Sequence, residues 1–400
     1  LIFLVDRTLL KRFHEIKQFR YGLFVILIIS FSVFVKKIKV YPFLKTLSQE
    51  DKLAKLYTPP VFKSDISKRN LVIIYAESME DTYSDNKLFG KNLLSPLDKY
   101  FKESVRFKNL VQLPGSGWTI AGMVSSQCGI PLKIPLFIPG HAKQGNRIGE
   151  HFESYLPRAK CLGDVPAKDG YYQVYMGGAK LSFGGKGRFY KTHGYDEVLG
   201  FKHWINKYGK GIPKHRWGVA DDFLFKQAKQ KFRELTAKGK PFNLTLLTVD
   251  THHPSGLENP TCKKLGYRGL DGIIHCSAYL ISDFINYISQ SEIADNISII
   301  LMSDHLAMRN DFYDILVKQE RKNMAAVKIP GVANAIITDK TGHIDLFPLL
   351  LFAAGGRDSC KAGLGLLNPS FNSLCPRRKN FEEFKSSLGG HSQLISNMWR

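Results

Sequence analysis

Three residues with side chains that bind metal ions follow two buried, strand-like runs of the sequence. Glu77 comes directly after Leu71–Ala76 (LVIIYA), and Asp304 and His305 come after Ile297–Met302 (ISIILM) and one serine. Because the carboxyl ends of parallel strands gather ligand-binding residues at one edge of a sheet, we expect these three side chains to meet. Two carboxylates and an imidazole suit Mn²⁺, Mg²⁺ or Zn²⁺ and leave a position open for a reacting group. Taken singly, each residue is more often a cap, an ion-pair partner or a structural histidine.

A threonine at the start of a helix-like run could act as a nucleophile. Gly115–Trp118 (GSGW) leads into a run that begins at Thr119. The unpaired amides and the positive dipole end of a helix N-terminus stabilise a developing alkoxide and an incoming phosphate oxygen. Coordination by a metal ion would activate the hydroxyl further. The alternative is that Thr119 only caps the helix, as threonine commonly does.

The elements that would position these residues alternate between strands and helices. A third apolar run, Phe242–Val249, resembles the two runs before Glu77 and Asp304, and such runs are typical of strands buried on both faces of a parallel sheet. Apolar residues recur at helical spacing in Ala220–Ala237 and Ser277–Gln290. This alternation predicts an α/β fold, with a mostly parallel central sheet sandwiched by helices.

The N-terminal part predicts a membrane tether. The uncharged run Tyr21–Val35 lies between basic clusters, and flanking lysines allow a short apolar run to span a membrane. A buried core helix or an interfacial segment is the alternative, because a span usually needs about 20 apolar residues. The opening residues LIFLV are expected to end an earlier apolar segment. The predicted organisation is a tether over 1–40 with a transmembrane segment at about 21–35, a linker over 41–70, a main catalytic domain over 71–354 and a small appendage over 355–400.

The charge of the chain indicates an anionic partner. Lys and Arg number 57 against 35 Asp and Glu, a net charge of +22. Such a balance suits nucleic acid, a phospholipid surface or a phosphorylated substrate. No Arg- and Lys-rich helix and no aromatic RNA-binding pattern is present in the sequence, so we expect no nucleic acid partner. Basic residues around the apolar run weakly favour a location of the main domain outside the cytoplasm.

The cysteines agree with that location. The six cysteines contain no CxxC pair of the kind that binds zinc or performs redox chemistry. Six cysteines allow fifteen pairings. Short loops and Gly- and Pro-rich surroundings favour the sequential one, which is 128–161, 262–276 and 360–375. Six buried free thiols in a cytosolic protein are the alternative.

Five segments together resemble a known family. They are IIYAES at 73–78, GSGWTIAGMVSSQCGIPL at 115–132, TVDTHHP at 248–254, SDH at 303–305 and GHIDLFPLLL at 342–351. In this order they resemble the phosphoglycerol transferases that modify periplasmic glucans. Those enzymes belong with lipoteichoic acid synthases and sulfatases to the alkaline-phosphatase superfamily. The resemblance covers roughly residues 70–370 and implies an alkaline-phosphatase-like, or sulfatase-like, catalytic domain.

The resemblance also implies roles for individual residues. In such enzymes a metal ion, commonly Mn²⁺, is held by a Glu, a Thr, an Asp and a His, which here are Glu77, Thr119, Asp304 and His305. Thr119 would be the nucleophile, and His252 would assist at the substrate site. Phe183, Lys186 and Arg188 would bind the substrate, although Gly184 stands where the related enzymes have a Trp. A structural loop histidine and solvated loop charges are the alternatives. We expect the remaining histidines to be structural, including His193, His203, His215 and His343.

The implied reaction is a two-step transfer. The resemblance predicts movement of sn-glycerol 1-phosphate from phosphatidylglycerol to a periplasmic glucan through a phosphoglyceryl-threonine, with the domain in the periplasm at the bacterial inner membrane. A hydrolase of the sulfatase or phosphodiesterase type, using water as acceptor, is one alternative. Sulfatases have a modified Cys or Ser at the position of Thr119, which disfavours that reading. A non-catalytic protein that binds glycan or lipid at the membrane surface is the other alternative.

Overall fold

The computed structural model describes residues 17–37, 51–61, 68–134, 145–150, 152–356 and 360–400. It has two compact units, Leu1–Lys52 and Leu53–Arg400. In the first unit the predicted segment at 21–35 is helical and lies within α2 (Lys17–Lys37). No helix in these described ranges is both long and apolar enough to cross a membrane. The apolar segment expected at the start of the chain lies outside the described residues.

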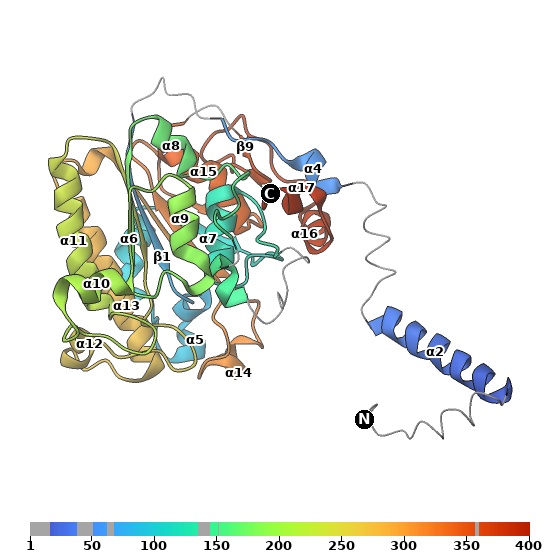
Figure 1. Cartoon of the computed structure of the whole chain (residues 1–400). Helices are drawn as coiled ribbons and strands as arrows, with labels where there is room; N and C mark the ends of the chain where they lie inside the picture. The colour runs from blue at the N-terminus through green and yellow to red at the C-terminus, as the bar shows by residue number, and fades with distance from the viewer. Residues whose placement is uncertain (1–16, 38–50, 62–67, 135–144, 151, 357–359) are drawn as a thin grey trace. The chain divides into compact units, whose positions relative to one another are not determined.

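An eight-stranded sheet, counted over the described residues, forms the centre of the second unit (Figure 1). Its strands are β1 (Asn70–Ala76), β2 (Val105–Leu110), β3 (Tyr172–Gly177), β4 (Glu197–Leu199), β5 (Phe242–Leu247), β6 (Ile297–Ser303), β7 (Asn323–Lys328) and β8 (Ala335–Ile337). They lie in the order β4-β3-β5-β1-β6-β7-β2-β8. Strands β4, β3, β5, β1 and β6 pair in parallel. Only β7 runs against its neighbours, β6 and β2. The predicted α/β fold with a mostly parallel sheet is confirmed.

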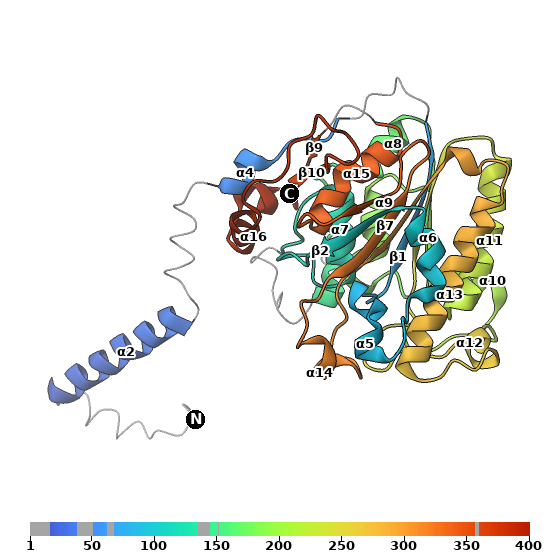
Figure 2. The same ribbon diagram turned by 180° about the vertical axis from the view of Figure 1, so that it is seen from behind.

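Helices cover both faces of this sheet. They include α7 (Thr119–Cys128), α9 (Lys186–Thr192), α10 (Phe201–Tyr208), α11 (Asp221–Ala237), α13 (Gly269–Ser289) and α15 (Leu346–Ala353). Further helices of this unit and its N-terminal edge are α4 (Lys52–Leu56), α5 (Asn86–Phe89), α6 (Asp98–Lys102), α8 (Asp164–Lys168), α12 (Pro260–Lys264), α14 (Tyr313–Leu316), α16 (Phe381–Gly389) and α17 (Gln393–Asn397). Figures 1 and 2 show α11 and α13 on one side of the sheet and α7, α9 and α15 on the other.

The continuous apolar sequence of β1 follows from this sandwich. Leu71, Ile73 and Tyr75 belong to the core on the α7 side. Val72 and Ile74 belong to the core on the α11 side. Every residue of the strand is buried, because successive side chains of a strand point to opposite faces and both faces are covered.

One helix begins earlier than the sequence predicts. We expected a helix over 277–290, and α13 spans Gly269–Ser289. Its first turns contain Gly269 and Gly272. Gly272 permits a close approach, because a Cβ there would lie 2.9 Å from the backbone carbonyl carbon of Tyr267. The two glycines therefore mark a tight entry into the helix rather than its absence.

The C-terminal segment packs into the main core. Leu367, Leu388 and Trp399 belong to the same buried cluster as residues of β1 and α7. A two-stranded ribbon of β9 (Lys361–Ala362) and β10 (Gly365–Leu366) lies at its start. The boundary placed at 355 stays a prediction.

All six cysteines form disulfides in the predicted pairing. The bonds are Cys128–Cys161, Cys262–Cys276 and Cys360–Cys375. The first joins the end of α7 to the segment before α8, and the second joins α12 to α13. The alternative of six free thiols is wrong.

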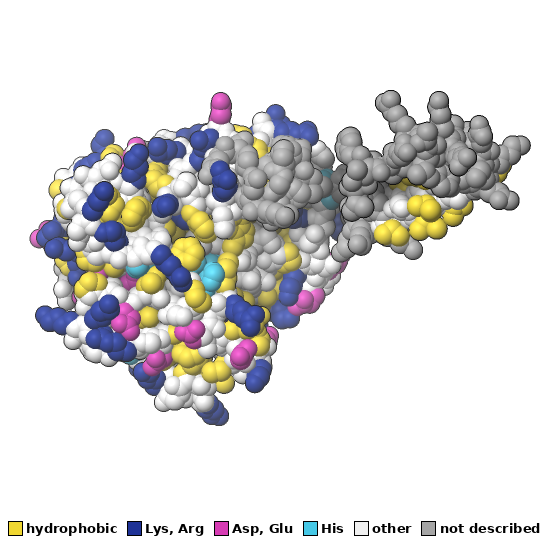
Figure 3. Space-filling view, turned by 60° about the horizontal axis from the view of Figure 1, so that its bottom comes forward, with side chains coloured by type: hydrophobic (Ala, Val, Ile, Leu, Met, Phe, Trp, Pro, Cys, Tyr) yellow, Lys and Arg dark blue, Asp and Glu magenta, His cyan; other side chains and the backbone are white. Residues whose placement is uncertain are grey.

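Basic side chains are spread over one face of the second unit. Figure 3 shows lysines and arginines scattered over the described part of one face, among fewer acidic side chains. They do not gather into a single stripe on that face. This distribution suits a general attraction to an anionic surface better than a groove for a nucleic acid strand.

Candidate active site

The register of two central strands brings the predicted metal ligands together. β1 and β6 pair in parallel with Ala76 opposite Ser303, so the residues that follow them, Glu77 and Asp304, leave the sheet side by side. His305 comes next in the chain. The expectation that these three side chains meet at the carboxyl ends of the two strands is therefore confirmed.

Four side chains form one buried cluster at this edge. The ligand atoms of Glu77, Asp304 and His305 all lie within 4.8 Å of one another. The Thr119 hydroxyl lies 3.4 Å from Glu77 Oε2 and 3.5 Å from His305 Nε2. All four residues are at most 5% exposed. The structure thus brings together the four residues that the sequence predicts as metal ligands, and their role as ligands stays a prediction.

Neighbouring groups fix the orientation of these side chains. The Nδ1–H of His305 donates to the carbonyl of Leu306 at 2.7 Å, which leaves Nε2 facing Glu77 and Asp304. The amides of Ser78 and His305 both donate to Asp304 Oδ1 at 2.9 Å. Such outer hydrogen bonds hold metal-binding side chains in one orientation and set the tautomer of a histidine ligand.

The buried charges of the cluster shift one another's protonation. Burial and the negative charge of Glu77 raise the pKa of Asp304 to about 8. Burial alone would raise the pKa of Glu77, but the neighbouring His305 holds it well below its usual range. Burial alone would lower the pKa of His305, yet Asp304 and Glu77 raise it to about 10. The cluster therefore retains protons at neutral pH, and a divalent cation would displace them on binding.

The donor set fits a divalent cation. Asp304 Oδ2 is buried, accepts no hydrogen bond from the described residues and lies 3.3 Å from His305 Nε2. A buried carboxylate oxygen without a donor is unfavourable unless an ion or a proton satisfies it. Two carboxylates, one hydroxyl and one imidazole nitrogen are ligands that Mn²⁺, Mg²⁺ and Zn²⁺ accept. Glu77, Thr119, Asp304 and His305 would hold such an ion.

Helix α7 presents Thr119 to the cluster. Thr119 is its first residue, and Trp118 precedes it in extended conformation. The whole of α7 is buried, and Gly122, one turn further on, touches the loop that carries the other ligands. A Cβ at Gly122 would lie 1.7 Å from the carbonyl oxygen of Asp304. The missing side chain therefore lets the helix that bears Thr119 approach Asp304.

A cavity of about 230 Å³ adjoins the cluster, and Glu77, Thr119 and His252 line it. The Nδ1–H of His252 donates to the carbonyl of His253 at 3.0 Å, so Nε2 is the nitrogen left to accept a proton. The volume is below that of sites for drug-sized ligands and suits a small group. The position of His252 is compatible with proton transfer or a phosphate contact, and its role stays a prediction.

Phe183 and Lys186 line the same cavity. The Lys186 ammonium lies 4.6 Å from the centre of the Phe183 ring, and this lysine is 2% exposed. Burial lowers the pKa of Lys186 to about 8, although Glu77 and Asp304 act in the opposite direction. A buried cation beside the cluster is suited to bind a phosphate oxygen.

The structure explains Gly184 and separates Arg188 from the cavity. Gly184 has a φ of 62°, and a Cβ there would lie 2.9 Å from the Ile120 side chain and 3.2 Å from that of Trp118. Packing against α7 thus excludes a larger residue at this position. Arg188 is exposed and lines a separate open groove with Glu153. It is not among the residues that the structure brings to the cluster.

Sequence reasoning missed one wall of the cavity. Arg216 and Trp217, from the loop between α10 and α11, line it together with Thr248. The Trp217 and His252 rings lie 4.0 Å apart between centroids. Thr248 follows β5 and accepts a hydrogen bond from the amide of Glu77 at 2.9 Å. Thr248 could have been found at its strand end, whereas Arg216 and Trp217 lie in a loop that carries no such signal.

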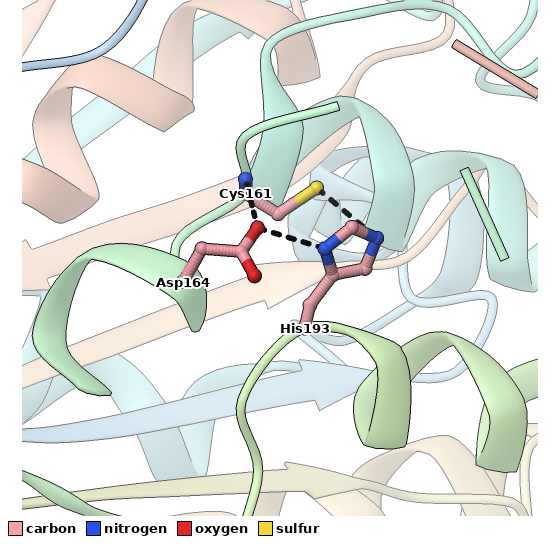
Figure 4. A group of neighbouring side chains, drawn as sticks. All are labelled: Cys161, Asp164 and His193. Atoms are coloured by element: carbon pink, nitrogen blue, oxygen red, sulfur yellow. Dashed lines mark hydrogen bonds and ion pairs between the residues drawn. The ribbon is translucent and has the colours of Figure 1, made fainter. Parts of the chain in front are cut away.

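A second cluster of metal-type side chains consists of Cys161, Asp164 and His193 (Figure 4). His193 Nδ1 lies 2.8 Å from Asp164 Oδ2, and its Nε2 lies 3.6 Å from the Cys161 sulfur. The sulfur belongs to the disulfide with Cys128, so no thiolate is present to bind a metal ion. This cluster fits the structural role expected for His193.

The other histidines expected to be structural have local partners. The His343 Nε2–H donates to the carbonyl of Ser303 at 2.8 Å, and burial lowers the pKa of His343 to about 4. The His203 ring packs edge-on against Trp204. His215 pairs with Asp250 at 3.0 Å. None of the three is among the residues that line the cavity beside Thr119.

The sequence of this chain matches a known family and is similar to named proteins. Residues 69–356 match the Sulfatase family. A protein named phosphoglycerol transferase I from Xanthomonas axonopodis pv. citri is 44% identical over 283 residues, which cover 69% of this chain and 39% of that protein. One of the same name from Escherichia coli is 36% identical over 325 residues, covering 78% of this chain and 41% of that protein. The chain therefore spans less than half the length of these relatives.

Solved structures share the fold. A protein of the alkaline phosphatase superfamily from Vibrio parahaemolyticus aligns with a TM-score of 0.59 at 17% identity, covering 89% of this chain and 93% of that chain. A lipoteichoic acid synthase from Listeria monocytogenes aligns with the same TM-score of 0.59 at 18% identity, covering 80% of this chain and 81% of that chain. At these identities the likeness concerns the fold alone.

Proposed function

We propose that this protein is a phosphoglycerol transferase, because the chain belongs to the Sulfatase family and relatives at 36–44% identity carry that name. The donor would be phosphatidylglycerol, the transferred group sn-glycerol 1-phosphate, and the acceptor a periplasmic glucan. The resident ion would be Mn²⁺, with Mg²⁺ or Zn²⁺ as substitutes.

The position of Thr119 carries the proposal. Its hydroxyl lies between Glu77 and His305, at the N-terminus of the buried helix α7 and on the wall of the adjoining cavity. A bound cation would lower the pKa of this hydroxyl and offset charge on the phosphate. A threonine in this place also disfavours a sulfatase.

Two displacements at phosphorus would complete the reaction. First, Thr119 Oγ1 bonds to phosphorus, the bond to the diacylglycerol oxygen breaks, and the threonine proton ends on diacylglycerol. Then a glucan hydroxyl oxygen bonds to phosphorus, the bond to Thr119 breaks, and the glucan proton returns to the threonine. His252 Nε2 can carry the proton in each step, since it lines the same cavity. Lys186 would hold a phosphate oxygen, and positioning and charge would supply most of the rate.

The donor lipid requires a membrane nearby. In α2 the apolar side chains from Leu23 to Val33 are exposed, which is the kind of surface that a lipid bilayer covers. The net charge of +22 favours an anionic lipid surface. Three disulfides indicate an oxidising compartment. These features support attachment to the bacterial inner membrane with the catalytic unit in the periplasm.

A labelled donor tests the proposal. Protein loaded with Mn²⁺ is incubated with phosphatidylglycerol that is labelled in its headgroup, with and without β-glucan. We expect label on the glucan, and loss of both transfer and bound Mn²⁺ in Glu77→Ala. The matched control Glu292→Ala, which removes an exposed carboxylate, should behave as wild type. Release of glycerol phosphate at one rate with or without glucan would instead identify a phosphodiesterase. Lipid binding without turnover or a stoichiometric ion would identify a binding protein.

A further inference from the structure

Two exposed cations line the cavity beside Thr119 and have no role in the mechanism above. They are Lys180 and Arg216. The other described residues that line the cavity are buried or half-buried. The two exposed residues therefore lie where the cavity opens to solvent, which is the mouth of the cavity.

A pairing between two loops brings these cations to one part of the mouth. Lys180 follows β3, and Arg216 lies between α10 and α11. An antiparallel bridge joins Ala179 to Gly218. A Cβ at Gly218 would lie 2.4 Å from the carbonyl oxygen of Gly178, so the glycine permits the close approach of the loops. Lys180 comes directly after Ala179 and Arg216 shortly before Gly218, so both cations lie toward the same end of the pairing.

Neither cation has a carboxylate partner. The side chains of Lys180 and Arg216 form no ion pair and no hydrogen bond within the described ranges. The Arg216 guanidinium lies 5.4 Å from the centre of the Trp217 ring, which supports it at the wall. Lys231, in contrast, pairs with Glu197 at 3.0 Å. Cations that gather at an opening without a counter-charge attract anions from outside.

The inner part of the cavity has its own cation for the reacting phosphate. Lys186 lines the cavity and is 2% exposed, so it lies away from the mouth. Glu77 is the only acidic side chain among the described residues that line the cavity, and it belongs to the predicted ion site. The positive charge at the mouth is thus left for a second anion.

The size of the cavity indicates what this second anion is. A volume of about 230 Å³ suits a small group such as glycerol phosphate and is too small for two acyl chains. The acyl chains of a donor lipid would stay in the bilayer, because their transfer to water is unfavourable. The mouth must therefore face the headgroup layer during the first displacement. In that layer other anionic headgroups surround the donor.

We propose that Lys180 and Arg216 form a docking site for the anionic phospholipid headgroups of a bilayer, which holds the mouth against the membrane while the donor enters. The inference rests on the proposed function, since it assumes a donor with two acyl chains. Each Lys or Arg near an anionic surface strengthens attachment to it. Electrostatic docking is reversible and is weakened by salt, so the mouth can afterwards open to an acceptor from water.

A comparison of two donors tests the proposal. The Mn²⁺-loaded full chain in phosphatidylcholine vesicles receives either phosphatidylglycerol within the bilayer or water-soluble dihexanoylphosphatidylglycerol. The measured quantity is the ratio of KM for the bilayer donor to KM for the soluble donor. Lys180→Gln and Arg216→Gln should each raise this ratio roughly 5-fold, and the double variant roughly 30-fold. The matched control Lys238→Gln/Lys240→Gln removes two exposed cations between α11 and β5, at the amino ends of the strands, and should keep the wild-type ratio.

A second measurement follows docking without turnover. Phosphatidylserine is anionic and carries no glycerol headgroup, and a lipid with a nitroxide on its headgroup quenches tryptophans near the headgroup layer. Trp217 is the reporter, because Arg216 lies over its ring. The full chain should be quenched more in vesicles with phosphatidylserine than in those with phosphatidylcholine alone. Trp217→Phe and the double variant Lys180→Gln/Arg216→Gln should both lose most of this difference.

Other outcomes would overturn the proposal. An unchanged ratio would remove the docking site, and an equal rise of KM for both donors would assign the cations to the reacting phosphate. The same rise of the ratio in the control variant would show a general attraction between charges. A rise of KM for the glucan alone would assign the mouth to the acceptor. Failure of the proposed function is a separate result, because absence of transfer with intact quenching that depends on Lys180 and Arg216 would reject the transferase and keep the docking site.

Discussion

Substitution of Gly122 by alanine tests how closely α7, the helix that bears the proposed nucleophile Thr119, must approach the proposed metal site. A Cβ at Gly122 would lie 1.7 Å from the carbonyl oxygen of Asp304, whereas real Cβ atoms essentially never approach within 3.0 Å. Helix α7 and the Asp304 loop would therefore have to separate by more than about 1 Å. Thr119 begins the same helix, one turn earlier. The substitution should thus widen the site without changing a ligand.

The expected losses follow from this displacement. Overpacking of a buried position destabilises a fold by about 1–3 kcal/mol. This loss exceeds the ~0.4–1 kcal/mol by which replacing glycine with alanine usually stabilises the folded state. A misplacement of about 1 Å at reacting groups lowers rate by about 100-fold. Gly122→Ala should therefore unfold at lower denaturant, bind Mn²⁺ more weakly and transfer phosphoglycerol at about one hundredth of the wild-type rate.

Denaturant melts, Mn²⁺ titration and the transfer assay measure these three effects. Gly389→Ala is the matched control, because Gly389 also lies in a helix, α16, and has no atom within 4 Å of an added Cβ. It should be as stable as wild type or slightly more stable. A Gly122→Ala protein with wild-type stability, metal affinity and rate would refute the claim that this contact positions Thr119.

The remaining predictions concern charge, metal and disulfides. Burial lowers the pKa of Lys186 to about 8, so its ammonium loses its proton as the pH rises past that value. The KM for the anionic donor should then rise. Lys186→Arg, which keeps its charge, should remove this rise in KM. Mn²⁺ at about 100 times its Kd should stabilise the folded wild-type protein by about 2.7 kcal/mol and should not stabilise Asp304→Ala. Thermal melts with and without a chelator measure this difference. Loss of the Cys262–Cys276 bridge, whose partners are 14 residues apart, should cost about 3 kcal/mol in denaturant melts and leave metal affinity unchanged; equal stability would contradict the role of the bridge.

The sequence predicted the parts of the site that depend on local pattern. Burial on both faces requires a continuous apolar strand, so β1, β5 and β6 were predictable within two residues at either end. Their parallel pairing places Glu77 beside Asp304, which the strand-end rule anticipates. The first residue of α7 was predictable because the glycines of GSGW interrupt regular secondary structure directly before an apolar helical run.

Contacts between distant segments, other than those at the strand ends and the disulfides, were not predictable. The Trp217 wall depends on a loop that is joined to the His252 loop through His215 and Asp250, and no spacing in the sequence indicates that juxtaposition. The antiparallel direction of β7 likewise depends on long-range pairing with β6 and β2. Arg188 follows Lys186 by two residues, and only the structure shows that one is exposed while the other is buried.

The central claim is that Thr119 carries phosphoglycerol between the two displacements. Without an acceptor the ester on Thr119 can leave only by hydrolysis, so it should accumulate when labelled phosphatidylglycerol is abundant. Mass spectrometry of the digested protein maps the label. The account predicts label on the peptide that contains Thr119, partial label in Thr119→Ser and none in Thr119→Ala. Transfer by Thr119→Ala at the wild-type rate would contradict it, and the nucleophile would then be another residue.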